Sequence, residues 1–188
     1  MSTEEQDLIL RAKDGDRGAF GEIYTRYKKK IYYYLYRLVR SEEVAQELLQ
    51  ETFIHLYTSL KTYMPTGKVA ALIYTSAHNT ATNWQMRQSR GNKIFSRQKS
   101  SQDKSETAEP LEYIKDDRFR PDLIAQGKEG VSEIVDAINR LPEKYRVTLL
   151  LIYVEGLSYE EVSEILDCSL TALRSRVHRA KKLLAEML

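Results

Sequence analysis

The sequence is poor in the features that define several protein classes. A single cysteine, Cys168, leaves no partner for an internal disulfide and no cluster that could hold zinc. The longest apolar run, Leu149 to Val154, is six residues long, whereas a membrane-spanning helix needs roughly 20. The first residues are acidic and contain no apolar segment of the signal-peptide kind. We therefore expect a cytoplasmic protein that folds without a disulfide, a metal or a cofactor.

The amino-acid composition is otherwise that of a globular protein. Hydrophobic residues make up 42% and charged residues 30% of the 188 residues. These fractions exclude a wholly disordered chain and a collagen-like repeat. The length suits one ordinary domain or two small ones. The packing of apolar side chains must therefore hold the fold together.

The net charge of +2 hides an uneven distribution of charge along the chain. Residues 41–60 contain four acids and no lysine or arginine, whereas residues 85–104 contain six bases and one acid. A second basic segment, residues 173–188, contains five bases and one acid. Each basic segment is a candidate for contact with nucleic-acid phosphates. The alternative for both is a solvated helix face.

Helical signals dominate, and no segment shows a convincing two-residue alternation. We expect helices over about residues 3–15, 17–40, 41–60 and 69–90, with Asp16 capping the second and Ser41 starting the third. In the third helix, apolar residues recur every four positions from Val44 to Leu60 and must face a core.

Residues 91–130 lose this periodicity, since only ten of these forty residues are apolar. A stretch of that length does not belong inside a compact domain. We therefore predict an all-α fold of two small helical domains, residues 1–90 and 131–188, joined by a flexible linker, residues 91–130.

The C-terminal domain has the element order of a helix-turn-helix. Helices are expected over residues 131–140 and 142–156, and a capping box at residues 158–161 starts a short helix that reaches Leu166. A tight turn then leads into a last, basic helix from Leu170.

One side of this last helix is apolar, and the opposite side carries the side chains that can reach DNA. Hydroxyl, imidazole and guanidinium groups can contact base edges in the major groove, and cations can neutralise phosphates. The predicted DNA contacts are Thr171, Arg174, Ser175, His178, Arg179 and Lys182. Arg176 projects nearer the packed side, and we expect it to form an ion pair with a glutamate of the preceding helix. The alternative is an amphipathic helix that binds another protein.

The fourth helix combines aromatic residues with amides and cations. Tyr63, Tyr74 and Trp84 lie on or near it, together with two asparagines and two arginines. Rings that stack on bases, next to cations that follow the backbone, are what the capture of a single strand requires. The alternative is that rings at helical spacing belong to the core.

Several segments together resemble the extracytoplasmic-function class of bacterial sigma factors, the promoter-specificity subunits of RNA polymerase. The segments Leu141–Arg146, Glu155–Val162 and Leu173–Ala180 resemble region 4 of that family in order and spacing. Glu47–Phe53 resembles its region 2.2, and Gly15–Phe20 resembles the start of region 2. Both blocks occurring in one chain is more specific than either block alone.

The resemblance implies a sigma factor that binds core polymerase, directs it to promoters and helps to open the minus-ten DNA. It implies that polymerase is bound by Glu47, Leu48, Gln50, Glu51 and Ile54. It implies that the minus-ten strand is held by Tyr63, Lys68, Asn79, Asn83, Trp84, Arg87 and Arg90. The last helix would contact duplex DNA at the minus-thirty-five element. An anti-sigma factor is a further expected partner.

Two other functions are alternatives to this one. A helix-turn-helix regulator that acts without polymerase would explain the C-terminal half, but it would leave the acidic third helix unexplained. An enzyme is not expected, because the sequence contains no phosphate loop, no paired metal ligands and no nucleophile with its base.

Overall fold

The computed structural model describes residues 3–62, 68–93 and 137–187. The chain divides into two compact units, residues 1–102 and 103–188. Every regular element in the described residues is helical, which confirms the predicted all-α class with two helical domains. The predicted linker lies mostly outside the described residues, so its bounds and those of the two domains stay predictions.

The described part of the N-terminal unit contains four helices: α1 (Thr3–Lys13), α2 (Arg17–Val39), α3 (Glu42–Leu60) and α4 (Val69–Lys93). The predicted starts of α2 and α3 are confirmed. The Asp16 carboxylate accepts hydrogen bonds from the backbone N–H groups of Gly18 and Ala19, and the Ser41 hydroxyl accepts one from Val44. Between α2 and α3, Arg40 has a left-handed backbone with φ of 56°, which turns the chain sharply.

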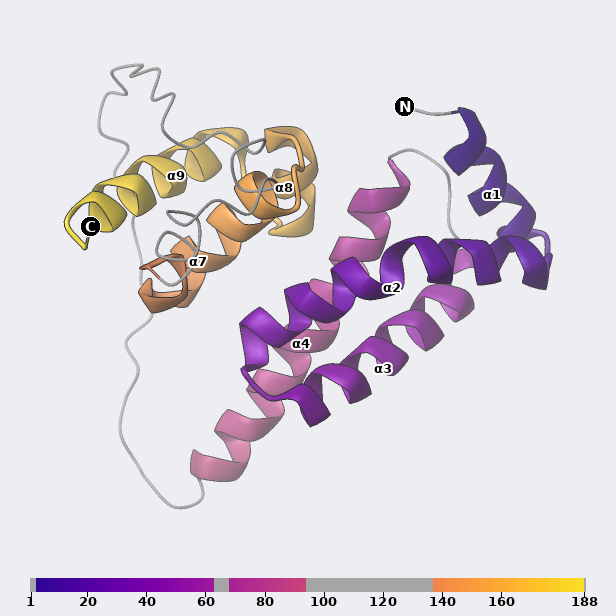
Figure 1. Cartoon of the computed structure of the whole chain (residues 1–188), viewed down its shortest axis with the longest axis horizontal. Coiled ribbons are helices and arrows are strands. Elements are labelled where there is room, and N and C mark those ends of the chain that lie inside the picture. The colour runs from indigo at the N-terminus through magenta and orange to yellow at the C-terminus, as the bar shows by residue number, and fades with distance from the viewer. Residues whose placement is uncertain (1–2, 63–67, 94–136, 188) are drawn as a thin grey trace. The chain divides into compact units, whose positions relative to one another are not determined.

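The core of this unit lies between α2, α3 and α4, which run alongside one another, while α1 packs across them (Figure 1). The apolar stripe expected on α3 is confirmed: Leu48, Leu56 and Leu60 are fully buried. Thr52 is buried on the same stripe, and its hydroxyl donates to the carbonyl of Leu48 at 2.7 Å. The packing therefore fixes which side of α3 and α4 is left for partners.

In the C-terminal unit, residues 137–140 are helical and are followed by α7 (Glu143–Leu149) and η1 (Leu150–Val154). The helix predicted over residues 142–156 is thus a short α-helix that widens into a π-helix. Four consecutive residues, Leu149 to Ile152, are buried, so the segment is enclosed on every side. Pro142 stands in the N-cap position of α7.

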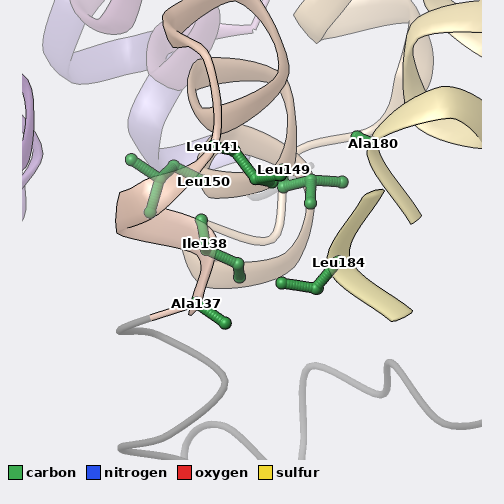
Figure 2. Packing of buried hydrophobic residues seen from close by; sticks show 7 residues of the cluster. All are labelled: Ala137, Ile138, Leu141, Leu149, Leu150, Ala180 and Leu184. Carbon is green, nitrogen blue, oxygen red and sulfur yellow. The ribbon is translucent and has the colours of Figure 1, made fainter. Parts of the chain in front are cut away.

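Among the described residues, two further helices of this unit follow, α8 (Tyr159–Ile165) and α9 (Leu170–Ala185). The predicted capping box of α8 is present: Glu161 donates its N–H to the Ser158 hydroxyl at 3.3 Å, and the Glu161 carboxylate accepts the Ser158 N–H at 2.8 Å. Figure 2 shows a cluster that joins α7 and η1 to the C-terminal half of α9 through Leu149, Leu150, Ala180 and Leu184. This cluster determines which side of α9 faces outward.

Candidate nucleic-acid interface

The turn that leads into α9 is stabilised by backbone and cap hydrogen bonds. Asp167 has a left-handed backbone with φ of 45°, and the N–H of Cys168 donates to the carbonyl of Ser163 at 3.0 Å. The Ser169 hydroxyl then caps α9 by accepting the N–H of Ala172 at 3.1 Å. The helix therefore starts in a well-determined direction relative to α8.

The outward side of α9 carries the residues that the sequence predicted. Leu173 and Val177 are buried together with the Figure 2 cluster residues Ala180 and Leu184, which leaves the opposite side open. Four predicted DNA contacts are exposed and two are half-buried. The exposed ones are Thr171, Arg174, His178 and Lys182, and the half-buried ones are Ser175 and Arg179. Together they form one polar surface with cations along its length.

Arg176 corrects a sequence prediction. Its side chain is half-buried as expected, and its Nε atom is buried without a hydrogen-bond acceptor. Within the described residues, however, it forms no ion pair with a glutamate of α8. One reason is that the buried carboxylate of that helix, Glu161, is already committed to Ser158 in the capping box.

Two tyrosines that were not predicted from the sequence, Tyr153 and Tyr159, lie close to α9. The ammonium group of Lys181 lies 5.4 Å above the centre of the Tyr153 ring. Burial raises the pKa of Tyr159 to about 12, and its hydroxyl is hydrogen-bonded to Tyr153. Tyr159 is therefore neutral at physiological pH and acts as a half-buried support that links α8, η1 and α9. Its place after Ser158 in the capping box was the only sequence signal.

A pocket lies between α3 and α4 in the N-terminal unit, with a volume of about 260 Å³. Seven of its eight lining residues have polar side chains, although apolar atoms make up more of the lining surface; the residues are His55, Ser59, Leu72, Thr75, Ser76, Asn79, Thr80 and Asn83. Ser76 also donates to the carbonyl of Thr52 at 3.2 Å, which ties α4 to α3 at the pocket.

Within the pocket, Thr80 is only 1% exposed, and its hydroxyl oxygen is buried without a hydrogen-bond partner among the described residues. Buried hydroxyls are rarely left unpaired. Asn79 and Asn83 stand one helical turn apart and are both exposed. The pocket therefore offers two exposed amide groups to an incoming ligand, whereas the Thr80 hydroxyl is buried behind its surface.

The structure brings together only some of the predicted minus-ten residues. Asn79 and Asn83 line the pocket, whereas Lys68, Trp84 and Arg87 lie elsewhere along α4 or at its start. Tyr63 and the side chain of Arg90 lie outside the described residues.

Other pocket residues escaped the sequence analysis. Leu72, Ser76 and Asn79 are spaced so that they lie on one side of α4, and this spacing indicates the α4 wall of the pocket. His55 and Ser59 come from α3 and could be assigned only from the packing. Tyr74, considered as a stacking ring, is 2% exposed and packs edge-on against Tyr34, with ring centroids 5.4 Å apart. The alternative interpretation, a core ring, is therefore the correct one for Tyr74.

The predicted polymerase-binding residues form what we call the acidic face of α3: Glu47, Gln50, Glu51 and Ile54. Glu47 and Gln50 are exposed, Ile54 is 62% exposed, and the Glu51 side chain is 33% exposed. The prediction that Leu48 contacts polymerase is corrected, because this side chain is 1% exposed and packs in the core, where no partner can reach it. The acidic face thus presents one bare aliphatic side chain among carboxylates.

An ion pair joins the acidic face to α4. Nη2 of Arg87 donates to Oε1 of Glu51 at 3.1 Å, and Nε of Arg87 donates to the carbonyl of Asn83 at 3.3 Å. In the described residues, no group of three His, Cys, Asp or Glu side chains could hold a metal ion. No helix among them is long and apolar enough to cross a membrane.

Comparison with known proteins assigns both units. The family description "Sigma-70 region 2" matches residues 23–91, and "Sigma-70, region 4" matches residues 132–184. The RNA polymerase sigma-H factor of Pseudomonas aeruginosa is 31% identical over 97% of this chain and 93% of its own length. The ECF RNA polymerase sigma-E factor of Haemophilus influenzae is 30% identical over 96% of this chain and 93% of its own.

Solved structures agree on the fold. CnrH, solved in complex with the cytosolic domain of CnrY, matches with a TM-score of 0.67 at 16% identity, covering 97% of this chain and 96% of its own. The sigma factor RpoE, solved with the anti-sigma factor NepR from Bartonella quintana, matches with a TM-score of 0.65 at 20% identity, covering 89% and 94%. With full-length relatives at 30% identity and above and both regions matched in order, this chain belongs to the extracytoplasmic-function class of the sigma-70 family of RNA polymerase sigma factors.

Proposed function

We propose that this alternative sigma factor places core RNA polymerase at specific promoters through three surfaces. In this proposal α9 contacts the minus-thirty-five duplex, the pocket between α3 and α4 holds an unpaired base of the minus-ten element, and the acidic face docks on polymerase. Membership of a family of DNA-binding polymerase subunits supports the inference that the chain catalyses no reaction of its own. It also supports the cytoplasm, where polymerase works, as the place of action.

The observation that carries the proposal is the pocket between α3 and α4 with the exposed amides of Asn79 and Asn83 in its lining. A base that leaves a duplex loses its stacking and pairing, and it needs a site that replaces the lost hydrogen bonds. The amides of Asn79 and Asn83 can donate to and accept from a base edge. Opening then requires no covalent chemistry, because base capture offsets the cost of unstacking.

The surface on α9 supports contact with duplex DNA. Its exposed side combines Arg174 and Lys182, which can neutralise phosphates, with Thr171 and His178, which can hydrogen-bond to base edges. The four fully buried residues of α9 are apolar, so its exposed side presents a single polar surface to a groove.

The acidic face supports docking on a basic partner surface. Glu47 and Glu51 supply negative charge, and Ile54 supplies an apolar contact at the C-terminal end of the face. Complementary charge steers the encounter of two proteins, and the buried apolar contact contributes to the affinity. An anti-sigma factor is a second proposed protein partner, because the similar RpoE was solved in complex with one.

The division of labour is tested with Asn79→Ala and Arg174→Ala in the full chain bound to core polymerase. We expect Asn79→Ala to reduce promoter opening, followed by permanganate reactivity, at least about fivefold, the loss that one base-edge contact predicts. We expect it to leave binding to a minus-thirty-five duplex unchanged. Arg174→Ala should weaken duplex binding and lower the slope of log affinity against log salt concentration by about one.

Matched controls are available in each unit. Thr82→Ala changes a half-buried residue of α4 outside the pocket, and Arg140→Ala removes an exposed cation outside α9. Equal loss of opening and duplex binding in Asn79→Ala would contradict the assignment of the pocket. Duplex binding and gene regulation without any association with polymerase would favour the rival, an independent helix-turn-helix regulator.

A further inference from the structure

The ion pair between Glu51 and Arg87 connects two surfaces to which different partners are assigned. Glu51 belongs to the acidic face on α3, and Arg87 belongs to the basic end of α4, 36 residues further along the chain. The guanidinium nitrogen and the carboxylate oxygen are 3.1 Å apart. Arg87 also donates to the backbone carbonyl of Asn83, a residue of the pocket. One side chain therefore touches the polymerase surface and the edge of the base pocket.

This contact works against the binding of DNA by Arg87. A carboxylate at hydrogen-bond distance occupies one donor of the guanidinium and offsets its positive charge. It also repels a phosphate that approaches the same arginine. Phosphate affinity depends on the number of cations free to replace counterions. In the free protein, Arg87 is therefore a weaker phosphate ligand than an unpaired arginine at the same place.

The pair is accessible enough to exchange its partners. The side chain of Arg87 is 60% exposed and that of Glu51 is 33% exposed. Ion pairs of this exposure are weakly coupled, because water and salt compete with them. A basic protein surface that takes the Glu51 carboxylate would therefore release the guanidinium at a small cost.

We propose that Glu51 is a positioning residue for strand capture: it holds Arg87 away from phosphate in the free protein, and polymerase docking on the acidic face releases it. This inference rests on the proposed function, since it requires a basic partner at Glu51 and DNA at Arg87. It explains how one docking event can raise affinity for the unpaired strand without a change of fold. The ion pair should lower the affinity of the free protein for the unpaired strand about two- to fivefold, which is the range of partly exposed ion pairs.

The test is a double-mutant cycle in the full chain without polymerase. The variants Glu51→Gln, Arg87→Gln and the double variant are titrated against a short fluorescein-labelled single-stranded DNA of mixed sequence, and anisotropy is measured at two salt concentrations. Glu51→Gln should tighten binding about two- to fivefold at low salt and make it more salt-dependent. In the Arg87→Gln background the same change should have no effect, because the cation that it releases is absent.

Two controls separate this mechanism from a general effect of charge or stability. Glu43→Gln makes the same charge change on the exposed first turn of α3, outside the acidic face, and it should leave strand affinity unchanged. Thermal unfolding of each variant should stay close to the wild type, since the pair is exposed. Equal tightening by Glu43→Gln and Glu51→Gln, tightening that survives in the Arg87→Gln background, or no tightening at all would each overturn the proposal.

A second measurement distinguishes its failure from failure of the proposed function. With core polymerase at saturating concentration, wild type and Glu51→Gln should bind the strand equally, because the carboxylate is then engaged by polymerase. A tightening of the free protein that persists unchanged in the complex would show that docking does not release Arg87. If the wild type with polymerase opens no promoter fragment at all, the proposed function fails, whatever the cycle shows.

Discussion

Replacing Ser158 with alanine should destabilise the C-terminal unit by far more than the loss of an ordinary helix cap. The Ser158 hydroxyl accepts the N–H of Glu161 at 3.3 Å, a long bond worth about 0.5 kcal/mol at the low end for caps. The same hydroxyl donates to the Glu161 carboxylate at 2.7 Å, and hydrogen bonds to charged groups contribute about 1.5–3 kcal/mol. Glu161 is 8% exposed, so water cannot readily replace that donor. The sum is about 2–3.5 kcal/mol.

Urea unfolding measures this difference, with Ser169→Ala as the matched control. Ser169 caps α9 through a single bond to Ala172 and is exposed, so its loss should cost only about 1 kcal/mol. Far-UV circular dichroism follows the helices of both units, whereas the only tryptophan, Trp84, reports on the N-terminal unit. We expect the tryptophan transition to stay in place in both variants. Equal destabilisation by the two serine variants would refute the role given to the buried carboxylate.

Three further predictions concern single side chains. Hydrogen bonds from the Ala19 N–H and from Arg11 lower the pKa of the Asp16 carboxylate below its ordinary value of about 3.9. The contribution of this carboxylate to stability is therefore complete above about pH 3.9, and it is lost as the pH falls through the lowered pKa. Asp16→Asn, which keeps a cap, should therefore unfold less steeply than wild type in acid titrations below about pH 4. Thr80→Val removes a buried, unpaired hydroxyl and should raise stability by up to about 1 kcal/mol in thermal unfolding; a loss of stability would show that the hydroxyl has a partner. Ile54→Arg should lower affinity for core polymerase at least about tenfold in a pull-down titration, with little change in stability because the side chain is 62% exposed.

Local signals in the sequence predicted much of this fold. The caps at Asp16, Ser41 and Ser158 depend on side chains within three residues of the bonds that they form. The apolar side of α9 followed from helical periodicity, which also sets the exposed positions. For Leu48, the four-residue periodicity indicated the core correctly, and the family resemblance wrongly indicated a contact.

The parts that escaped prediction depend on which helices meet. The pocket between α3 and α4 and the pairing of Glu51 with Arg87 join residues far apart in the sequence, and periodicity gives no information about the opposing helix. The missing ion pair of Arg176 has a local cause, because the capping box already engages Glu161, the buried carboxylate of α8. The π-helix η1 has no recognised signal, because its run of apolar residues fits a buried α-helix equally well.

The widened turn of η1 has a consequence for how this domain tolerates changes in length. A π turn accommodates one residue more than an α turn without ending the helix, and the Glu155 N–H donates to the Leu150 carbonyl five residues earlier at 2.9 Å. The segment thus behaves as a single-residue insertion in the last turn of the α7–η1 helix. Deleting one residue there would convert it to ordinary α-helix and leave the elements downstream in their places, whereas the same deletion within α8 or α9 would rotate every later side chain by about 100°.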